Sequence, residues 1–111
     1  KFHQDKDVLA VQNYLEEHFT KRLTLKHVAH EHNMTERTLI RRFKQACAIT
    51  PIQYLQGLRL EQARKILETS MSPLESIVNS VGYEDLSSFT RLFKKYTGLS
   101  PSQYRAKFIR K

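Results

Sequence analysis

The sequence predicts an all-α fold of about seven helices, in which two copies of one helical module flank a long helix. Three observations support this prediction. The chain repeats itself at a spacing of about 50 residues, its apolar residues recur at helical spacing, and it contains three glycines and three prolines. An all-β domain would need many more turn residues. With 111 residues, 40% of them hydrophobic, the chain is long enough for one packed domain.

The repeat is clearest where residues 39–44 (LIRRFK) match residues 89–94 (FTRLFK), 50 positions later. Further upstream the spacing falls to 49, because Val28 and Ala29 match Ile77 and Val78. We therefore expect one additional residue in the turn of the second copy, where insertions are tolerated. Two copies of one module explain this pattern better than chance does.

The front of the chain and the first module show helical spacing. An N-terminal amphipathic helix is expected, with Val8, Val11, Leu15 and Phe19 on one face. In the first module, Thr24 and Thr35 are expected to cap two helices, and Asn33 to form the turn, since Asn tolerates a left-handed conformation. The expected inner faces of these two helices comprise Leu25, Val28, Ala29 and His32, followed by Leu39, Phe43, Ala46 and Cys47.

A long linker helix is expected over about 51–68, opened by Thr50 and Pro51 and spanning roughly 27 Å. Its apolar residues are expected to pack on both modules: Leu55, Leu58, Ala63, Ile66 and Leu67. In the second module, residues 72–75 (SPLE) predict a capping box on Ser72 with Pro73 in the first helical position. Gly82 is expected to form the turn and Asp85 to cap the next helix.

The inner faces of the second module are expected to comprise Ile77, Val78 and Val81, followed by Phe89, Phe93, Tyr96 and Thr97. A last short helix opens at residues 100–103 (SPSQ). A helix, a tight turn and a second helix of this length are typical of a helix-turn-helix motif. We therefore expect a single domain over residues 1–111, with subdomain one at about 7–50, the linker helix at about 51–68 and subdomain two at about 72–108.

The charge balance favours a polyanionic partner. Lys and Arg number 19 against 11 acidic residues, which gives a net charge of +8. Such an excess is typical of proteins that bind nucleic acid or an anionic membrane surface. Membrane binding would need one continuous basic amphipathic helix, whereas the charge here is spread over several elements. No apolar run approaches 18 residues, and the lone Cys47 suits a reducing cytoplasm, so no membrane partner is expected.

The buried stripes determine which side chains of the second helix in each module point outward. These are Glu36, Arg37, Ile40, Arg41 and Lys44 in the first copy, and Leu86, Ser87, Thr90, Arg91 and Lys94 in the second. Arginine can donate two hydrogen bonds to guanine, at O6 and N7, and Ile or Leu can contact a thymine methyl group. A merely solvated helix face would normally mix charges of both signs. We therefore expect both helices to recognise double-stranded DNA.

Contacts to DNA phosphates are expected near the capped helix N-termini, whose free N–H groups favour anions. The candidate side chains are Thr38, Lys44, Ser88, Thr90, Lys94 and Lys95. Arg42 could reach a phosphate or form an ion pair on the surface, and the sequence leaves both possibilities open.

Other classes of function find less support. His27, His30 and His32 lie close together, but a zinc site normally needs a fourth ligand and Cys47 falls on a buried stripe, so no metal is expected. No phosphate-binding glycine loop or nucleophile motif is present, so we expect neither an enzyme nor a cofactor. A helical bundle that binds a protein such as RNA polymerase is the second hypothesis, and it would show a contiguous apolar groove. The two activities can coexist.

Several segments resemble the AraC/XylS family of bacterial transcription regulators: residues 39–44 (LIRRFK), 54–60 (YLQGLRL), 63–67 (ARKIL), 81–85 (VGYED) and 89–105. The resemblance covers about residues 15–108. It implies two helix-turn-helix subdomains whose recognition helices enter successive major grooves, roughly 34 Å apart. It also implies that bases are read by Arg37, Ile40 and Arg41 in the first unit, and by Leu86, Ser87 and Arg91 in the second, with Thr90 nearer the DNA backbone.

Such regulators usually carry a separate effector or dimerisation domain, so the resemblance implies one elsewhere in the full-length protein, with RNA polymerase as a further partner. Residues 12–19 and 83–85 resemble the subgroup whose N-terminal domain is similar to class I glutamine amidotransferases. The chain departs from the family pattern at three positions. His32 and Val78 stand where an apolar residue and a small alanine are usual, and Ala48 stands where the second copy has Gly98. The Ala48 substitution predicts a strained or altered helix end.

Overall fold

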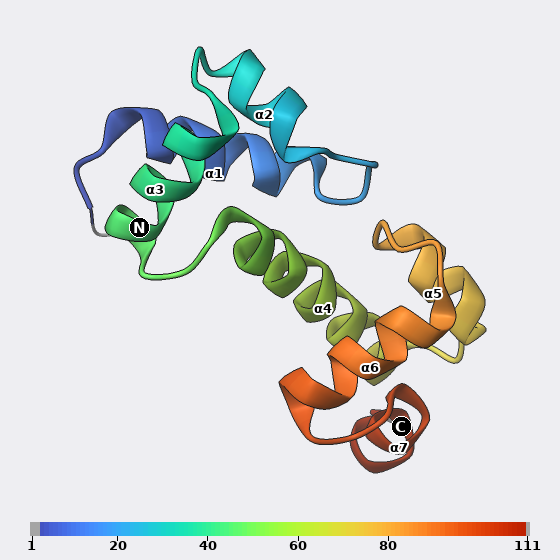
Figure 1. The fold of residues 1–111 in the computed structure, drawn as a ribbon. Coiled ribbons are helices and arrows are strands. Elements are labelled where there is room, and N and C mark those ends of the chain that lie inside the picture. The colour runs from blue at the N-terminus through green and yellow to red at the C-terminus, as the bar shows by residue number, and fades with distance from the viewer. Residues whose placement is uncertain (1–2, 111) are drawn as a thin grey trace. The chain divides into compact units, whose positions relative to one another are not determined.

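The computed structural model describes residues 3–110, and all regular secondary structure in that range is helical. The helices are α1 (Lys6–His18), α2 (Leu25–Glu31), α3 (Glu36–Cys47), α4 (Pro51–Thr69), α5 (Leu74–Ser80), α6 (Leu86–Thr97) and α7 (Pro101–Phe108) (Figure 1). The predicted all-α fold of about seven helices is confirmed. The chain forms two compact units, and the boundary between Leu58 and Arg59 falls inside α4.

The first unit contains α1, α2, α3 and the beginning of α4 (Figure 1). Its core consists of Val8, Val11, Leu15, Val28, Ala29, Leu39, Phe43 and Leu55. Most of these positions follow the predicted stripes, and burying each large apolar side chain contributes about 1.5–3 kcal/mol. Cys47 and Ala46 are partly buried at the edge of this core, so the predicted inner face of α3 is confirmed in its main part.

The second unit contains the remainder of α4 together with α5, α6 and α7. Its core consists of Leu60, Ala63, Leu67, Ile77, Val78, Val81, Phe89, Phe93 and Tyr104. Helix α4 thus supplies Leu55 to one core and Ala63 and Leu67 to the other, as the sequence predicted.

Polar caps start most of these helices where the sequence predicts them. The Thr24 hydroxyl accepts the N–H of His27 at 3.1 Å, and the Thr35 hydroxyl accepts the N–H of Thr38 at 3.1 Å. Ser100 and Gln103 form a complete capping box at the start of α7. These bonds satisfy N–H groups that a helix leaves without intrahelical partners.

Two sequence predictions in the second unit are wrong. Ser72 does not cap α5, which begins at Leu74 after Pro73 without a side-chain cap; the Ser72 hydroxyl instead accepts from the Ser70 hydroxyl at 3.2 Å. Tyr96 is not buried but 53% exposed. Tyr104 of α7 packs edge-on against Phe93, with ring centroids 5.4 Å apart, so the core is already covered before the stripe reaches Tyr96.

Candidate nucleic-acid interface

Both units contain a helix-turn-helix with the same backbone bonds. In the first turn Asn33 has a φ of 57°, and the N–H of Met34 donates to the Ala29 carbonyl at 2.9 Å. In the second turn Gly82 has a φ of 97°, and the N–H of Tyr83 donates to the Val78 carbonyl at 3.0 Å. The positive φ explains why Asn and Gly occupy these positions. The predicted turns are therefore confirmed.

His32 stands where an apolar residue is usual, and its ring forms a local hydrogen bond. Its ring Nδ1 lies 2.7 Å from the Val28 carbonyl oxygen, and the ring packs edge-on against Tyr14 at 5.3 Å between centroids. A half-buried imidazole with a satisfied nitrogen costs little. The departure from an apolar residue therefore leaves the first turn intact.

The outer face of α3 is cationic and bears one apolar side chain. Arg37, Arg41 and Lys44 are exposed, and Ile40 is 39% exposed. Among residues 3–110, none of the three cations has an ion-pair partner, whereas Arg42 and Arg64 do. Arginines that are not engaged within the protein remain available to an anionic ligand.

The predicted phosphate candidate Thr38 is half-buried at the first turn of α3. Its hydroxyl oxygen accepts from Thr35 at 3.0 Å, which leaves its own proton available for donation. The α3 N-terminus therefore offers a hydroxyl donor beside free backbone N–H groups.

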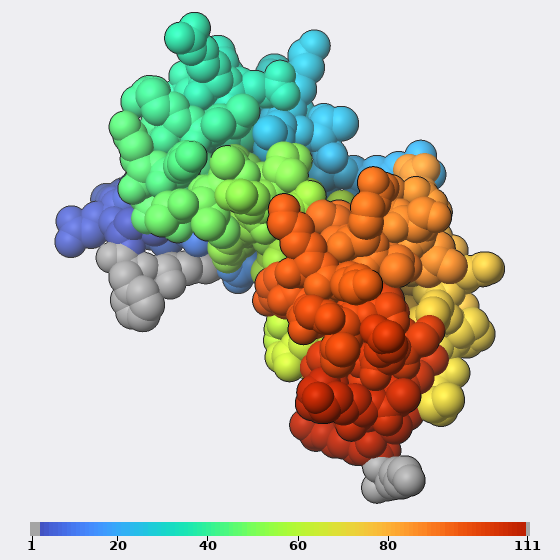
Figure 2. All heavy atoms as spheres, turned by 60° about the horizontal axis from the view of Figure 1, so that its bottom comes forward, coloured from blue at the N-terminus to red at the C-terminus, as the bar shows by residue number. Residues whose placement is uncertain are grey.

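Helix α6 presents the corresponding face of the second unit. Leu86 is 36% exposed, and Ser87, Arg91, Lys94 and Lys95 are exposed, while Thr90 is half-buried. Figure 2 shows α3 in green and α6 in orange, each at the surface of its own unit. The structure thus places the predicted base-reading residues of each helix on one accessible face of that helix.

Ser88 is engaged differently from Thr38. Its hydroxyl donates to the Asp85 carboxylate at 2.7 Å, and the backbone N–H groups of Ser87 and Ser88 donate to the same carboxylate. The Ser88 hydroxyl, followed by these N–H groups, lowers the pKa of Asp85. Since its proton is used by the helix cap, Ser88 is less available to a phosphate than the other candidates.

Arg42 forms ion pairs instead of projecting into solvent. Its Nη2 lies 2.7 Å from Asp5 Oδ1, and its Nη1 lies 3.1 Å from Asp7 Oδ2. The sequence left open whether this side chain pairs on the surface or reaches a phosphate. The structure shows it paired with the start of α1.

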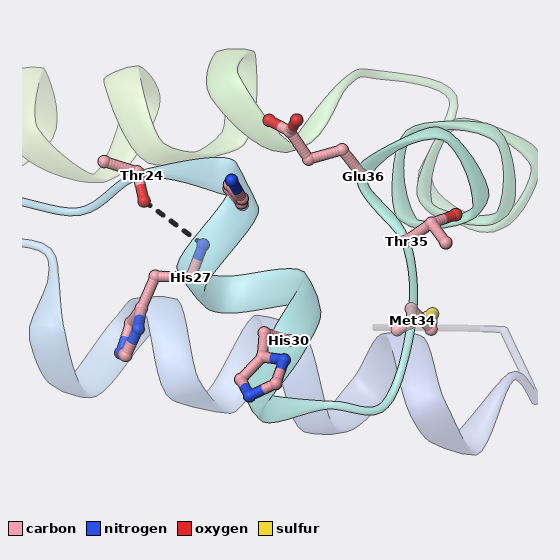
Figure 3. A pocket seen from close by; sticks show the side chains of 7 residues that line it. Thr24, His27, His30, Met34, Thr35 and Glu36 are labelled. Atoms are coloured by element: carbon pink, nitrogen blue, oxygen red, sulfur yellow. Dashed lines mark hydrogen bonds between the residues drawn. The ribbon is translucent and has the colours of Figure 1, made fainter.

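A pocket of about 610 Å³ opens beside the N-termini of α2 and α3 (Figure 3). It is lined by Thr24, Lys26, His27, His30, Met34, Thr35 and Glu36. Lys26 was not among the predicted site residues, because it belongs to the first helix of the motif rather than the recognition helix. Its place two residues after the Thr24 cap was the signal that could have identified it.

Within the described range, no group of three or more His, Cys, Asp or Glu side chains is arranged to hold a metal ion. The Nε2 atom of His27 instead lies 3.4 Å from Oε1 of Glu31, one helical turn away. None of the described helices has the length and apolar character needed to cross a bilayer.

Comparison with known proteins supports a regulatory DNA-binding domain. The family described as a helix-turn-helix domain matches residues 28–107. The raffinose operon transcriptional regulatory protein RafR of Pediococcus pentosaceus is 39% identical over 93 residues, which are 84% of this chain and 34% of RafR. The chain spans about a third of the length of the curated relatives it matches.

Solved structures show the same similarity. The C-terminal domain of AraT, a response regulator from Geobacillus stearothermophilus, matches with a TM-score of 0.92 and 33% identity, over 96% of this chain and 89% of that one. The DNA-binding domain of AdpA, a global transcriptional factor in complex with a target DNA, matches with a TM-score of 0.86 and 27% identity, over 92% of each chain.

Proposed function

Because this chain belongs to the AraC/XylS family of sequence-specific DNA-binding transcription regulators, we propose that α3 and α6 are its two recognition helices. Each enters the major groove of the same duplex, in successive turns of the DNA. The family acts by binding DNA and not as an enzyme. The observation that supports the proposal most strongly is the set of exposed arginines beside exposed Ile40 and Leu86.

The proposed base contacts are divided between the two helices. Arg37 and Arg41 bond guanine edges or other acceptors, and Ile40 contacts a thymine methyl group. In α6 the corresponding residues are Leu86, Ser87 and Arg91. Each bidentate arginine contact contributes about 1–3 kcal/mol of discrimination against a wrong base.

The proposed phosphate contacts lie beside these positions. They involve Thr38, Lys44, Thr90, Lys94 and Lys95, with Lys26 added from the pocket at the α2 N-terminus. Ser88 belongs to the same group only if its hydroxyl leaves Asp85. Such contacts set register and affinity without reading sequence.

For the intact protein we propose a cytoplasmic transcription regulator. The present chain is its DNA-binding domain, with subdomains at about 7–50 and 72–108 and the linker helix at about 51–68. An effector or dimerisation domain elsewhere in the protein supplies the signal, and RNA polymerase is a further partner. The similarity to RafR, the transcriptional regulatory protein of the raffinose operon, supports this role.

The test is selection of bound sequences from random 30-bp duplexes, followed by affinity measurements at two salt concentrations. We expect a defined sequence with two half-sites about one helical turn apart. Lys44→Ala and Lys94→Ala will weaken binding to all duplexes alike and reduce the dependence on salt by about one counterion each. Recovery of no preferred sequence would contradict the proposal.

A further inference from the structure

The structure assigns Arg42 a positioning role: it fixes the first recognition helix to the start of α1, without itself contacting DNA. This inference rests on the proposed role of α3 in reading bases. It starts from the two aspartates that hold the guanidinium, here called the Asp5–Arg42–Asp7 clamp.

The clamp uses every nitrogen of the guanidinium group. Arg42 Nη2 and Nε donate to the two carboxylate oxygens of Asp5, at 2.7 and 3.2 Å, and Nη1 lies 3.1 Å from Asp7 Oδ2. The same Nη1 lies 3.8 Å from the sulfur of Met34, in the turn between α2 and α3. A bidentate arginine–carboxylate pair restricts direction as well as distance. The orientation of Arg42 is therefore set from two sides.

The Asp5 carboxylate contacts both α1 and α3. Its carboxylate accepts the backbone N–H groups of Asp7 and Val8, both at 3.1 Å, and so caps α1. The side chains of Asp5 and Arg42 are 22% and 29% exposed, so the pair is shielded more than an ordinary surface ion pair. Ion pairs of this kind contribute more than fully exposed ones. The clamp therefore links the start of α1 directly to α3.

The position of Arg42 explains why this link matters for DNA binding. It lies between Arg41, which is exposed on the recognition face, and Phe43, which is fully buried. A small rotation or shift of α3 would move Arg37 and Arg41 relative to the base edges that they are proposed to contact. Because displacements of about 1 Å disrupt a precisely oriented contact, holding the helix contributes to specificity.

The second unit supplies an internal comparison. Leu92 occupies the position that corresponds to Arg42, 50 residues later, and packs against the apolar core instead of forming ion pairs. Arg42→Leu therefore introduces the residue that the second unit has at the matching position of α6. It removes the clamp and keeps an apolar contact.

The test compares the affinity of each variant for the selected duplex with its affinity for a scrambled duplex of equal length and charge. Arg42→Ala and Arg42→Leu are expected to lower this ratio roughly three- to thirtyfold. Loss of folded protein alone would lower both affinities equally and leave the ratio unchanged. The slope of affinity against salt should also stay unchanged, because no phosphate contact is lost.

Asp5→Asn combined with Asp7→Asn supplies the matched control, since asparagine still caps a helix but no longer pairs with arginine. In this background Arg42→Ala should change the ratio by less than about twofold, because the coupling is already gone. If Arg42→Ala leaves the ratio unchanged, or lowers both affinities with a smaller salt slope, the positioning role is wrong. If Arg37→Ala also leaves the ratio of the two affinities unchanged, the proposal that α3 reads bases is wrong, and the result no longer bears on Arg42 alone.

Discussion

The two units of this chain build one architecture with different chemistry. Helices α2 and α5 each have 7 residues, and α3 and α6 each have 12. The correspondence extends to α1, because Val8, Val11 and Leu15 lie 52 positions before Leu60, Ala63 and Leu67, and all six are core residues. Helix α1 therefore corresponds to the second part of α4. Helical packing fixes which positions are buried, while the residue at each position varies.

A tyrosine–glutamate hydrogen bond is the clearest feature that the two units share. Tyr54 donates to Glu16 at 2.5 Å, and Tyr104 donates to Glu68 at 2.6 Å. In the second unit Arg64 also donates to the Tyr104 hydroxyl and to Glu68, both at 3.3 Å. The first unit holds its recognition helix through Arg42, whereas the second concentrates its polar network around α4 and α7. The difference suggests where each unit is sensitive to mutation.

The largest expected effects come from the matched core phenylalanines. Phe43→Ala and Phe93→Ala each remove a fully buried ring and are expected to cost about 3–5 kcal/mol in the free energy of unfolding. Phe93 should lie at the upper end, because it contacts both Phe89 and Tyr104. Urea unfolding followed by circular dichroism measures both. A loss below 1 kcal/mol in either variant would contradict the core assignment.

The tyrosine hydroxyls provide a sharper comparison. Tyr104→Phe leaves Glu68 and Arg64 without a shared partner in a buried setting, and should cost about 1.5–3 kcal/mol. Tyr54→Phe removes a more exposed bond to Glu16 and should cost about 1 kcal/mol or less. The same unfolding measurement decides the order. The reverse order would show that the Arg64 network adds no stability.

The sequence predicted these elements unevenly, for physical reasons. Caps and turns depend on residues within one helical turn, so Thr24, Asn33 and Asp85 could be assigned from local pattern alone. Asp5 pairs with Arg42 across 37 positions, a contact that no local pattern contains. Tyr96 was misplaced because periodicity shows a stripe but not where another helix closes the core. The exposed cations of α3 and α6 could be predicted because they lie opposite a clear apolar stripe.

The helix ends offer a reciprocal substitution. Ala48 and Gly98 both end a recognition helix with positive φ, 68° and 83°, and donate to the carbonyls of Lys44 and Lys94. Because alanine is strained in this conformation, Ala48→Gly should raise the free energy of unfolding by about 0.5–1 kcal/mol.

The reverse change, Gly98→Ala, should lower it by about 1 kcal/mol, since no atom lies within 4 Å of the added Cβ and only conformational strain is introduced. Thermal unfolding of both variants measures the effect. A free energy of unfolding that is unchanged or lower in Ala48→Gly would rule out strain at Ala48.

The smallest expected effect is a pH dependence confined to the clamp. Burial opposes ionisation of Asp5, but bonds from the Val8 N–H and from Arg42 outweigh it and lower the pKa of the carboxyl. The stability from this group is therefore present above the pKa of an unfolded aspartate, about 3.9, and lost as the pH falls through the lower folded pKa. The stability difference between Arg42→Leu and the parent should consequently be largest at neutral pH and shrink as the pH falls below about 3.9. A stability difference that grows on acidification would contradict this assignment.

The central claim is that each unit presents one helix that reads bases. The most direct measurement is the affinity of the parent, Arg37→Ala and Arg91→Ala for the selected duplex and for duplexes carrying each single base-pair change. Each variant is expected to lose about 1–3 kcal/mol on the selected duplex and to lose its preference at one base pair, in a different half-site for each arginine. If either variant keeps the base preferences of the parent, the helix that carries that arginine does not read DNA as described.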